Sequence, residues 1–345
     1  MGITNTSGVT DLGALAHGAA VLTGDPDQSP LAVVDLDAAR DAPPELVSRA
    51  CSEQSKPTVV TVGIATEPVS PSLAPLLEAL TTTLAPAGPG HAWVPADTDA
   101  LERISATVRT APTAALTLAN LLRMAPRGTV ADHLQLESLA YSTLLAGSEF
   151  RAWRARTPTA PVPDDSRPVL LDRDGDILTI TLNRPERHNA FGRAVRDGLI
   201  EGLELALADD SLSSVVLRGA GRSFCSGGDL AEFGTAADPA AAHLVRLGRS
   251  AGRLMHELGD RVRVEVHGAC IGAGVEVPSF AAEVVARDDA FFQLPELAMG
   301  LIPGAGGTVS LTQRIGPWRT AFLALTGDWI GVGTALEWGL VDGRL

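Results

Sequence analysis

The sequence predicts an α/β protein with a mainly parallel sheet in its C-terminal half, and two observations support this fold class. From residue 169 onward, short runs rich in Val, Ile and Leu alternate with amphipathic segments of helical spacing. Gly-rich turns follow the apolar runs, as in α/β proteins whose ligands lie where strands end and helices begin. This order implies right-handed crossovers and a sheet that is buried on both faces.

The first half of the chain is less regular. Residues 31–36 and 57–63 are strand candidates, and the helix-like run 73–84 follows the second of them. Residues 98–156 carry apolar side chains at helical spacing and no clear strand, which predicts two or three helices. Glu137 within this region is expected to be a surface or capping residue.

A Pro-rich segment, 157–168, separates the two halves. Its four prolines disfavour both helix and strand, as is typical of a linker. We therefore expect residues 1–160 to form a βα piece followed by a helical region. Residues 161–168 would be the linker, and residues 169–345 the domain that carries the chemistry.

The second half follows the α/β pattern element by element. Residues 169–182 predict a hairpin that turns at Asp174–Gly175, because an Asp-Gly pair favours a tight turn. The next predicted elements are a helix around 195–207, a strand at 214–218, a helix over 240–258 and a strand at 262–266. A further helix-like segment contains, at steps of three or four residues, Val275, Ser279, Ala282 and Ala286.

Two glutamates near a Gly-rich turn are the strongest candidates for catalysis. The turn includes Gly272, and glycine lets the backbone come close to a bound group. Free N–H groups at the start of the next helix would point at that group. Glu276 lies in the first turn of this helix and Glu296 farther along. A glutamate beside such an anion site indicates acid–base chemistry on a polarised carbonyl, although a capping role is the alternative for each.

Composition and charge exclude several classes of function. The formal charge of −14 argues against non-specific nucleic-acid binding. Lys56 is the single lysine, so nearly all positive charge is arginine, which suits bidentate phosphate contacts. Cys51, Cys225 and Cys270 have neither a disulfide framework nor a zinc spacing, so we expect no metal and a cytoplasmic location. We find no apolar run long enough for a membrane span and no signal-peptide pattern.

Several ordered motifs in the second half resemble the crotonase (enoyl-CoA hydratase/isomerase) superfamily. They are RPERHNA at Arg184–Ala190, FCSGGD at Phe224–Asp229, the turn Gly268–Glu276, LPELAMGLIPGAGGT at Leu294–Thr308 and GLVD at Gly339–Asp342. Each motif alone is weak, and their common order makes the signal specific. The resemblance covers Val169 to the C-terminus. It implies a crotonase-like spiral core of ββα type with a mainly parallel sheet, and an acyl-CoA thioester as substrate.

The resemblance also implies catalytic roles for four matching residues. The amides of Gly228 and Ala273 would form an oxyanion hole, in which one N–H typically contributes about 2.7–4 kcal/mol. Most relatives have glycine where this chain has Ala273, so the added methyl group predicts a tighter pocket. Glu276 would orient and deprotonate the water that attacks the β-carbon, and Glu296 would deliver a proton to the α-carbon.

The first loop and the acyl-CoA signature would hold the coenzyme A moiety. By resemblance, the residues that bind it are Arg184, Arg187, His188, Ala190, Ser226, Gly227 and Asp229. No cofactor is implied beyond the coenzyme A of the substrate. Family members are commonly trimers or paired trimers, which implies a homo-oligomer that binds neither nucleic acid nor membrane.

The chain departs from the family pattern in the order of its parts. It ends soon after Asp342, where a family member would continue with helices that close over the coenzyme A. Residues 100–158 resemble that tail, including a basic residue at Arg123 and a glutamate-bearing helix around Glu137. We therefore expect a rearranged crotonase whose first half supplies the displaced closing helices. Arg123 would then occupy the place of a lysine that faces coenzyme A.

A second departure lies in the strand at 262–266. Arg263 and Glu265 are polar where the family usually has apolar residues. This pattern predicts that one face of the sheet meets a polar surface.

Hydration of a 2-enoyl-CoA, or the reverse dehydration in fatty acid metabolism, is the function that the resemblance favours. The same pocket supports isomerisation or thioester hydrolysis. A catalytically silent CoA-binding scaffold is a further alternative, which the rearranged tail favours and the presence of Glu276 and Glu296 disfavours. Candidates for the pocket lining are Phe233, Met255 and Trp318.

Overall fold

The computed structural model describes residues 9–10, 12, 30–53, 59–95, 97, 99–124, 128–157, 167–236 and 238–345. The chain forms two compact units: Met1–Arg127 with Gly316–Thr326, and Gly128–Ile315 with Gly327–Leu345. Lys56 and most of the expected linker lie outside the described residues. The contacts thus divide the chain between Arg127 and Gly128, before the Pro-rich segment. The expected boundaries at residues 160 and 168 stay a prediction.

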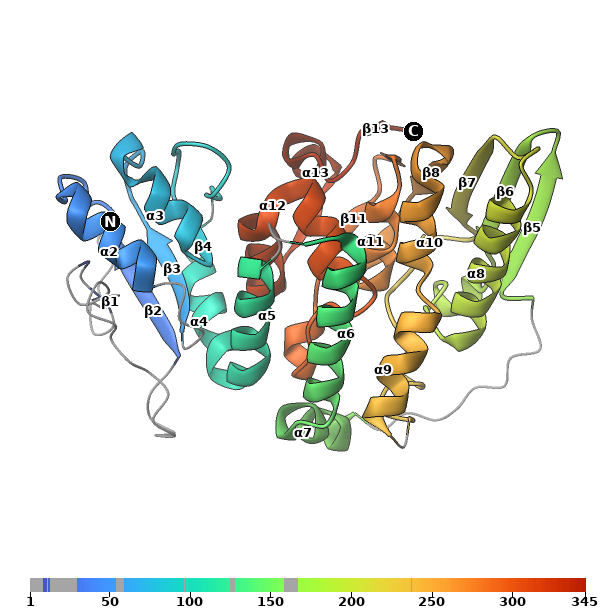
Figure 1. The fold of residues 1–345 in the computed structure, drawn as a ribbon, viewed down its shortest axis with the longest axis horizontal. Helices are drawn as coiled ribbons and strands as arrows, with labels where there is room; N and C mark the ends of the chain where they lie inside the picture. The colour runs from blue at the N-terminus through green and yellow to red at the C-terminus, as the bar shows by residue number, and fades with distance from the viewer. Residues whose placement is uncertain are drawn as a thin grey trace. The chain divides into compact units, whose positions relative to one another are not determined.

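The first unit contains a parallel sheet of strand order β1-β2-β3-β4 (Figure 1). Its strands are β1 Val9–Thr10, β2 Leu31–Asp35, β3 Val60–Ile64 and β4 Thr82–Leu84. Its helices are α2 Pro44–Glu53, the short 3-10 helix η1 Pro71–Leu73, α3 Ala74–Ala79, α4 Ala100–Thr110 and α5 Pro112–Met124. The strands expected at 31–36 and 57–63 are confirmed. The helix expected over 73–84 is wrong beyond Ala79, because consecutive β-branched threonines favour a strand there.

The region 98–156 forms four helices, more than the two or three expected. α4 and α5 belong to the first unit, and α6 Val130–Leu145 and α7 Ser148–Arg156 belong to the second. Pro112 begins α5, where its missing N–H costs nothing, and the residue before it is pushed out of the helical region. Gly147 separates α6 from α7 as the N-cap of the latter.

The second unit contains a six-stranded sheet of order β13-β10-β8-β7-β6-β5, in which only the β5–β6 pair is antiparallel. Its strands are β5 Val169–Asp174, β6 Ile177–Leu182, β7 Ser214–Gly219, β8 Val262–Val266, β10 Glu283–Ala286 and β13 Gly343–Arg344. A three-stranded sheet of order β12-β11-β9 joins β9 Ala269–Ile271, β11 Phe291–Gln293 and β12 Trp329–Gly331. The expected hairpin and mainly parallel sheet are confirmed, but the turn lies at Gly175–Asp176, one residue later than expected, because Asp174 still pairs with Ile177.

Helices cover this sheet and surround the region beside it. They are α6, α7, α8 Arg193–Ala208, α9 Pro239–Gly248, α10 Ala251–Leu258, α11 Ala273–Glu276, the first part of α12 Gly307–Thr326, and α13 Val332–Trp338. Short 3-10 helices are η2 Pro185–Arg187, η3 Gly259–Arg261, η4 Pro278–Phe280 and η5 Glu296–Met299. α8 packs on β5, β6 and α10, whereas α6 packs on α9, from far along the chain (Figure 1).

Two helix predictions in this half are corrected. The helix expected over 240–258 is two helices, because Ser250 caps α10 with a side-chain bond from the Arg253 amide at 3.2 Å. The helix-like spacing from Val275 to Ala286 does not produce one helix. Pro278 follows the short α11, a 3-10 turn comes next, and Ala286 ends strand β10.

The polar strand β8 lies in the interior of the sheet with one polar face. Its residues alternate between buried and half-buried, and Arg263 pairs with Glu265 at 3.5 Å and with Glu283 of β10 at 2.5 Å. Polar side chains thus satisfy one another on this face. Across the described residues, no helix has the length and hydropathy of a membrane span.

Candidate active site

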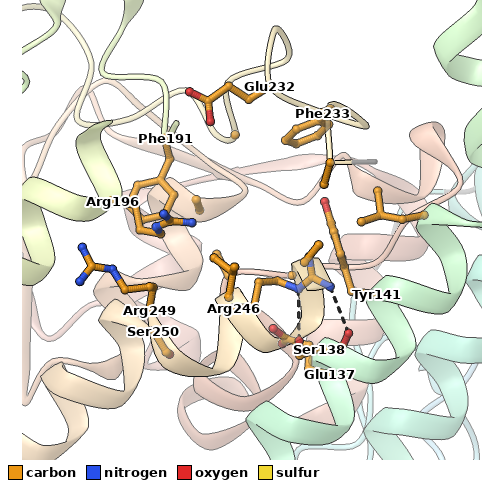
Figure 2. Close-up of a pocket in the computed structure, with 18 of the residues that line it drawn as sticks. Glu137, Ser138, Tyr141, Phe191, Arg196, Glu232, Phe233, Arg246, Arg249 and Ser250 are labelled. Atoms are coloured by element: carbon orange, nitrogen blue, oxygen red, sulfur yellow. Dashed lines mark hydrogen bonds between the residues drawn. The ribbon is translucent and has the colours of Figure 1, made fainter. Parts of the chain in front are cut away.

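A cavity of about 1360 Å³ in the second unit brings the four predicted catalytic residues together. Gly228, Ala273, Glu276 and Glu296 all line it. Other walls come from α6, α7, α9 and the loops after β7 and η5, and Figure 2 shows part of this lining. The catalytic set predicted from separate motifs therefore shares one cavity.

The two Gly-rich turns that carry Gly228 and Ala273 are held side by side. The backbones of Cys225 and Cys270 form a parallel bridge, with the Ile271 amide donating to the Cys225 carbonyl at 3.0 Å. A side chain on Gly274 would lie 2.3 Å from that carbonyl oxygen, so glycine permits the close approach. Gly228 follows Cys225 by three residues, and Ala273 follows Cys270 by three residues. The bridge between the two cysteines therefore brings the two turns with the predicted oxyanion amides side by side.

Both of these amides are available to a ligand. The Phe191 amide donates to the Gly227 carbonyl at 2.7 Å, and the Asp229 amide donates back to Phe191 at 3.3 Å. This exchange leaves out the N–H of Gly228. Within the described part of the chain, the N–H groups of Gly228 and Ala273 have no hydrogen-bond acceptor. Two unused donors in one cavity are what an oxyanion requires.

Glu276 is a buried carboxylate fixed by two backbone donors. Its Oε2 accepts the amides of Ala305 at 2.7 Å and Gly307 at 2.9 Å. Burial raises the pKa of Glu276 well above its ordinary value, and the charges of Glu296 and Glu137 raise it further. The two donors at the start of α12 oppose this shift and favour the ionised form.

Glu296 begins η5 directly after Pro295, and the residue is 7% exposed. A side chain on Gly272 would come within 2.4 Å of Glu296 Oε1, so the carboxyl group packs against the turn that precedes Ala273. Its Oε2 finds no hydrogen-bond partner among the residues that the structure describes. Burial raises the pKa of Glu296 to about 8, so the group holds a proton at neutral pH.

Glu137 of α6 joins this cluster, which the sequence alone did not indicate. Its Oε1 accepts the Gly306 amide at 2.8 Å, and its Oε2 accepts the amide and hydroxyl of Thr308 at 2.9 and 2.7 Å. Burial raises the pKa of Glu137 to about 7, against the effect of these three bonds. The expected capping role is confirmed and the expected surface position is wrong, because Glu137 is 2% exposed.

The start of α12 therefore holds two carboxylates at once. Four successive N–H groups alternate, those of Ala305 and Gly307 to Glu276 and those of Gly306 and Thr308 to Glu137. The first N–H groups of a helix lack internal partners and carry its positive dipole end. Residues 305–308 thus position the carboxylate of Glu276, and Glu137 of α6, a helix that comes earlier in the sequence, helps to fix these residues.

Three of the residues expected to bind coenzyme A pair with one another. Asp229 contacts Arg187 at 2.9 Å and Arg184 at 3.5 Å. Arg184 and Asp229 are both buried, and Asp229 lines the cavity. Asp229 thus partly neutralises both arginines, and their contact with coenzyme A stays a prediction.

The other expected contacts lie on the same two loops. The Ser226 amide donates to the carbonyl of His188 at 2.9 Å, and the His188 ring lies 3.1 Å from the Ser223 hydroxyl. The Ala190 amide donates to Arg187 at 3.0 Å, and Gly227 takes a positive φ of 95°. These loop residues are brought together beside the Gly228 turn, and their role in binding stays a prediction.

Arg123 lies in the first unit, on α5. Its guanidinium donates to the carbonyl of Val59 at 2.8 Å and to Asn120 at 2.9 Å. Its predicted contact with coenzyme A stays a prediction.

The three pocket-lining candidates have different outcomes. Phe233 lines the cavity, so that expectation is confirmed. Met255 is fully buried in the core, and Trp318 belongs to the first unit, where its indole donates to the carbonyl of Glu78 at 3.2 Å. Neither of these two lines the described cavity.

An α/β layer with two unused amides and several buried acids in one cavity is an arrangement suited to acid–base chemistry. The sequence model of the enoyl-CoA hydratase/isomerase family matches residues 172–344, and this chain belongs to that family, the crotonase superfamily. The fold is accordingly crotonase-like.

Curated relatives carry different activities in their names. The 2,3-dehydroadipyl-CoA hydratase of Escherichia coli is 34% identical over 174 residues, which are 50% of this chain and 68% of that protein. The trans-2-decenoyl-[acyl-carrier-protein] isomerase of Streptococcus mutans is 32% identical, over 51% of this chain and 69% of that one. The 1,2-epoxyphenylacetyl-CoA isomerase of E. coli is 36% identical, over 50% and 68%.

A crystal structure of an enoyl-CoA hydratase from Thermoplasma volcanium is 30% identical to this chain with a TM-score of 0.48. The match covers 52% of this chain and 72% of that one.

Proposed function

We propose that this protein adds water to a 2-enoyl-CoA thioester, or removes it in the reverse direction. One observation carries the proposal: Glu276, Glu296 and the unused amides of Gly228 and Ala273 line a single cavity. Hydration of a conjugated thioester needs all of these, because it requires an activated water, an oxyanion site and a proton donor.

In the forward step, the thioester oxygen accepts one hydrogen bond from the amide N–H of Gly228 and one from that of Ala273. Glu276 takes a proton from water as the water oxygen forms a bond to the β-carbon. The electrons of the carbon–carbon double bond move toward the thioester, so its oxygen gains the negative charge of an enolate. Glu296 then gives its proton to the α-carbon, and the enolate collapses to the 3-hydroxyacyl thioester.

The surroundings of the two acids support these proton roles. Two backbone N–H groups donate to Glu276, which favours its ionised form as a base. The Oε2 of Glu296 accepts no bond from the described residues, and burial there favours the protonated form. One turnover moves a proton from Glu296 to Glu276, and exchange with solvent restores the starting state.

One relative named as a hydratase and one named as an isomerase support chemistry on an enoyl thioester, and isomerisation is the alternative outcome. Isomerisation would move a proton between carbons of the acyl chain and incorporate no water. We also propose a homo-oligomer, as a trimer or paired trimers, which light scattering would test.

Mass spectrometry of crotonyl-CoA or a longer 2-enoyl-CoA incubated with the protein distinguishes these reactions. Hydration adds one water and hydrolysis releases free coenzyme A, whereas isomerisation keeps the mass and changes the retention time when chromatography precedes detection. We expect hydration, with Glu276→Gln and Glu296→Gln each lowering kcat/KM by about a hundredfold or more. Glu283→Gln, a half-buried glutamate on β10, is the matched control. A wild-type protein that binds coenzyme A and converts none of these substrates would favour the scaffold alternative.

A further inference from the structure

Seven arginines of the described chain line the cavity, and three of them pair with carboxylates. Arg196 and Arg249 share Asp197, at 2.8 and 3.1 Å, and Arg253 pairs with Glu257. The charges of these three are therefore compensated within the protein. Among the other four, Arg246 of α9 is fixed by side chains of α6 and by an aromatic ring.

Arg246 is held in place by uncharged partners from α6. Its Nε donates to the Ser138 hydroxyl at 3.2 Å, and its Nη2 donates to the Ser138 carbonyl at 3.3 Å and to the Ser142 hydroxyl. The guanidinium carbon lies 4.9 Å from the centre of the Tyr141 ring, over its face. Figure 2 shows Arg246 beside Tyr141, with dashed lines marking its bonds to Ser138. Its position is thus fixed without a counter-ion.

The cavity side of this arrangement offers unused donors. No carboxylate of the described chain lies within 4.0 Å of the Arg246 guanidinium, and its Nη1 has no hydrogen-bond acceptor there. The Tyr141 hydroxyl likewise has no hydrogen bond to the residues that the structure covers, and both side chains line the cavity.

Glu137 is the carboxylate whose charge acts on the pKa of Arg246, so it is the candidate for a counter-ion. Its two oxygens already accept the three donors of Gly306 and Thr308. Burying a cation without a paired anion is costly, so a site of this kind favours an anionic ligand.

The unused donors lie close to the proposed reaction centre. The Tyr141 ring packs on Gly304, where an added side chain would lie 2.3 Å from ring atoms. The next amide, that of Ala305, donates to Glu276. An acyl chain whose thioester occupies the Gly228 and Ala273 turns can therefore extend toward Tyr141 and Arg246 within one cavity.

We propose that Arg246, with the Tyr141 hydroxyl, binds a carboxylate at the far end of the acyl group. The substrate class would then be enoyl-CoA thioesters of dicarboxylic acids. This inference rests on the proposed function, because it places the acyl chain in the cavity of Glu276 and Glu296. A guanidinium nitrogen with two free N–H groups is a strong carboxylate donor in a partly desolvated site.

The test uses the full-length protein and pairs of 2-enoyl-CoA thioesters of equal chain length. One member of each pair ends in a carboxylate and the other in a methyl group. We expect kcat/KM to favour the carboxylate by about tenfold to a hundredfold at one chain length, the range of a charged hydrogen bond. Arg246→Gln should abolish that ratio and Tyr141→Phe should reduce it. Arg253→Gln, whose charge is paired, should leave the ratio within about twofold.

Calorimetry with the saturated thioesters and with coenzyme A alone separates failure of this inference from failure of the proposed function. A carboxylate preference in binding that Arg246→Gln removes, without turnover, would support the inference and reject hydration. No preference at any chain length would overturn the inference. An equal loss for both members in Arg246→Gln would mean that Arg246 only ties α9 to α6. Weaker binding of coenzyme A itself would assign Arg246 to the phosphates.

Discussion

Glu296 differs from the other two buried acids in its hydrogen bonds. It is nearly buried, and its Oε2 has no partner among the described residues. Glu276 and Glu137 are as deeply buried, but each accepts backbone N–H groups from the start of α12. Because the three carboxyl groups repel one another when ionised, charge is concentrated on those with donors. These hydrogen bonds favour Glu296 as the proton donor and Glu276 as the base of the proposed reaction.

This division predicts a bell-shaped dependence of kcat/KM on pH. The rate should rise as Glu276 ionises, above the ordinary pH range of a glutamate, since the pKa of Glu276 is raised. It should fall as Glu296 loses its proton near pH 8, because burial raises the pKa of Glu296 to about 8. Stopped-flow rates between pH 5 and 10 measure both limbs. A rate that stays constant through the alkaline range would contradict Glu296 as the proton donor.

The same raised pKa of Glu296 makes stability depend on pH. The folded protein binds this proton more tightly than the unfolded chain, so stability from this group is present at low pH. It is lost as pH rises toward about 8. Glu296→Gln removes the buried charge. We expect the free energy of unfolding of this variant to exceed that of wild type at pH 9 by about 1–3 kcal/mol, and to match it at pH 5. Urea titrations at both pH values measure it; an equal difference at both would contradict a buried proton.

At the scale of elements, α12 depends on α6. The N–H groups of Gly306 and Thr308, at the beginning of α12, would be buried without acceptors if Glu137 were removed. The same turn supplies the donors of Glu276, so the α6 carboxylate helps to fix the geometry of a predicted catalytic residue.

Glu137→Ala should therefore lower the free energy of unfolding by about 2–4 kcal/mol, since it leaves three buried donors unpaired. Glu137→Gln keeps one carbonyl oxygen and should cost about half as much. Glu204→Ala on the exposed face of α8 is the control and should stay within about 0.5 kcal/mol of wild type. Chemical denaturation measures all three variants. A Glu137→Ala protein as stable as the control would show that the α6 bonds contribute little.

Local sequence predicted the strands and the catalytic turns, but not Glu137. β5 and β6 depend on the turn at Gly175, whose φ is positive, and the Gly-rich turns likewise depend on neighbouring residues, so these signals are local. The partners of Glu137 lie 169 and 171 residues away, so spacing within α6 carries no trace of them. Helical spacing also misled the prediction around Val275, because Pro278 breaks the helix despite the apolar period.

At the scale of the whole molecule, segments that are neighbours in the sequence belong to different compact units. α6 and α7 precede the Pro-rich segment, yet they belong to the compact unit of the catalytic core and line its cavity. α4 and α5 belong to the other unit. The rearranged crotonase expected from sequence thus has support for α6 and α7 from contacts within one unit. Placement of the earlier helices over the site stays a prediction.

A chain cut inside the Pro-rich segment tests this arrangement. A protease site inserted at 161–168 should give two pieces that co-elute and keep most of the activity, because α6 packs on α9 and α10 and Glu137 binds the α12 turn. After separation in denaturant and refolding alone, the C-terminal piece should lose activity by about a hundredfold or more, or fail to fold. The intact chain carried through the same refolding is the control. A soluble, fully active C-terminal piece would contradict the role of α6.

A structure of the full-length protein with a saturated acyl-CoA bound tests the central claim most directly. We expect the thioester oxygen at about 2.7–3.1 Å from the amide nitrogens of both Gly228 and Ala273. The carboxyl groups of Glu276 and Glu296 should then flank the α- and β-carbons. A thioester oxygen that contacts neither amide, or a ligand whose reacting carbons lie away from both acids, would contradict the account.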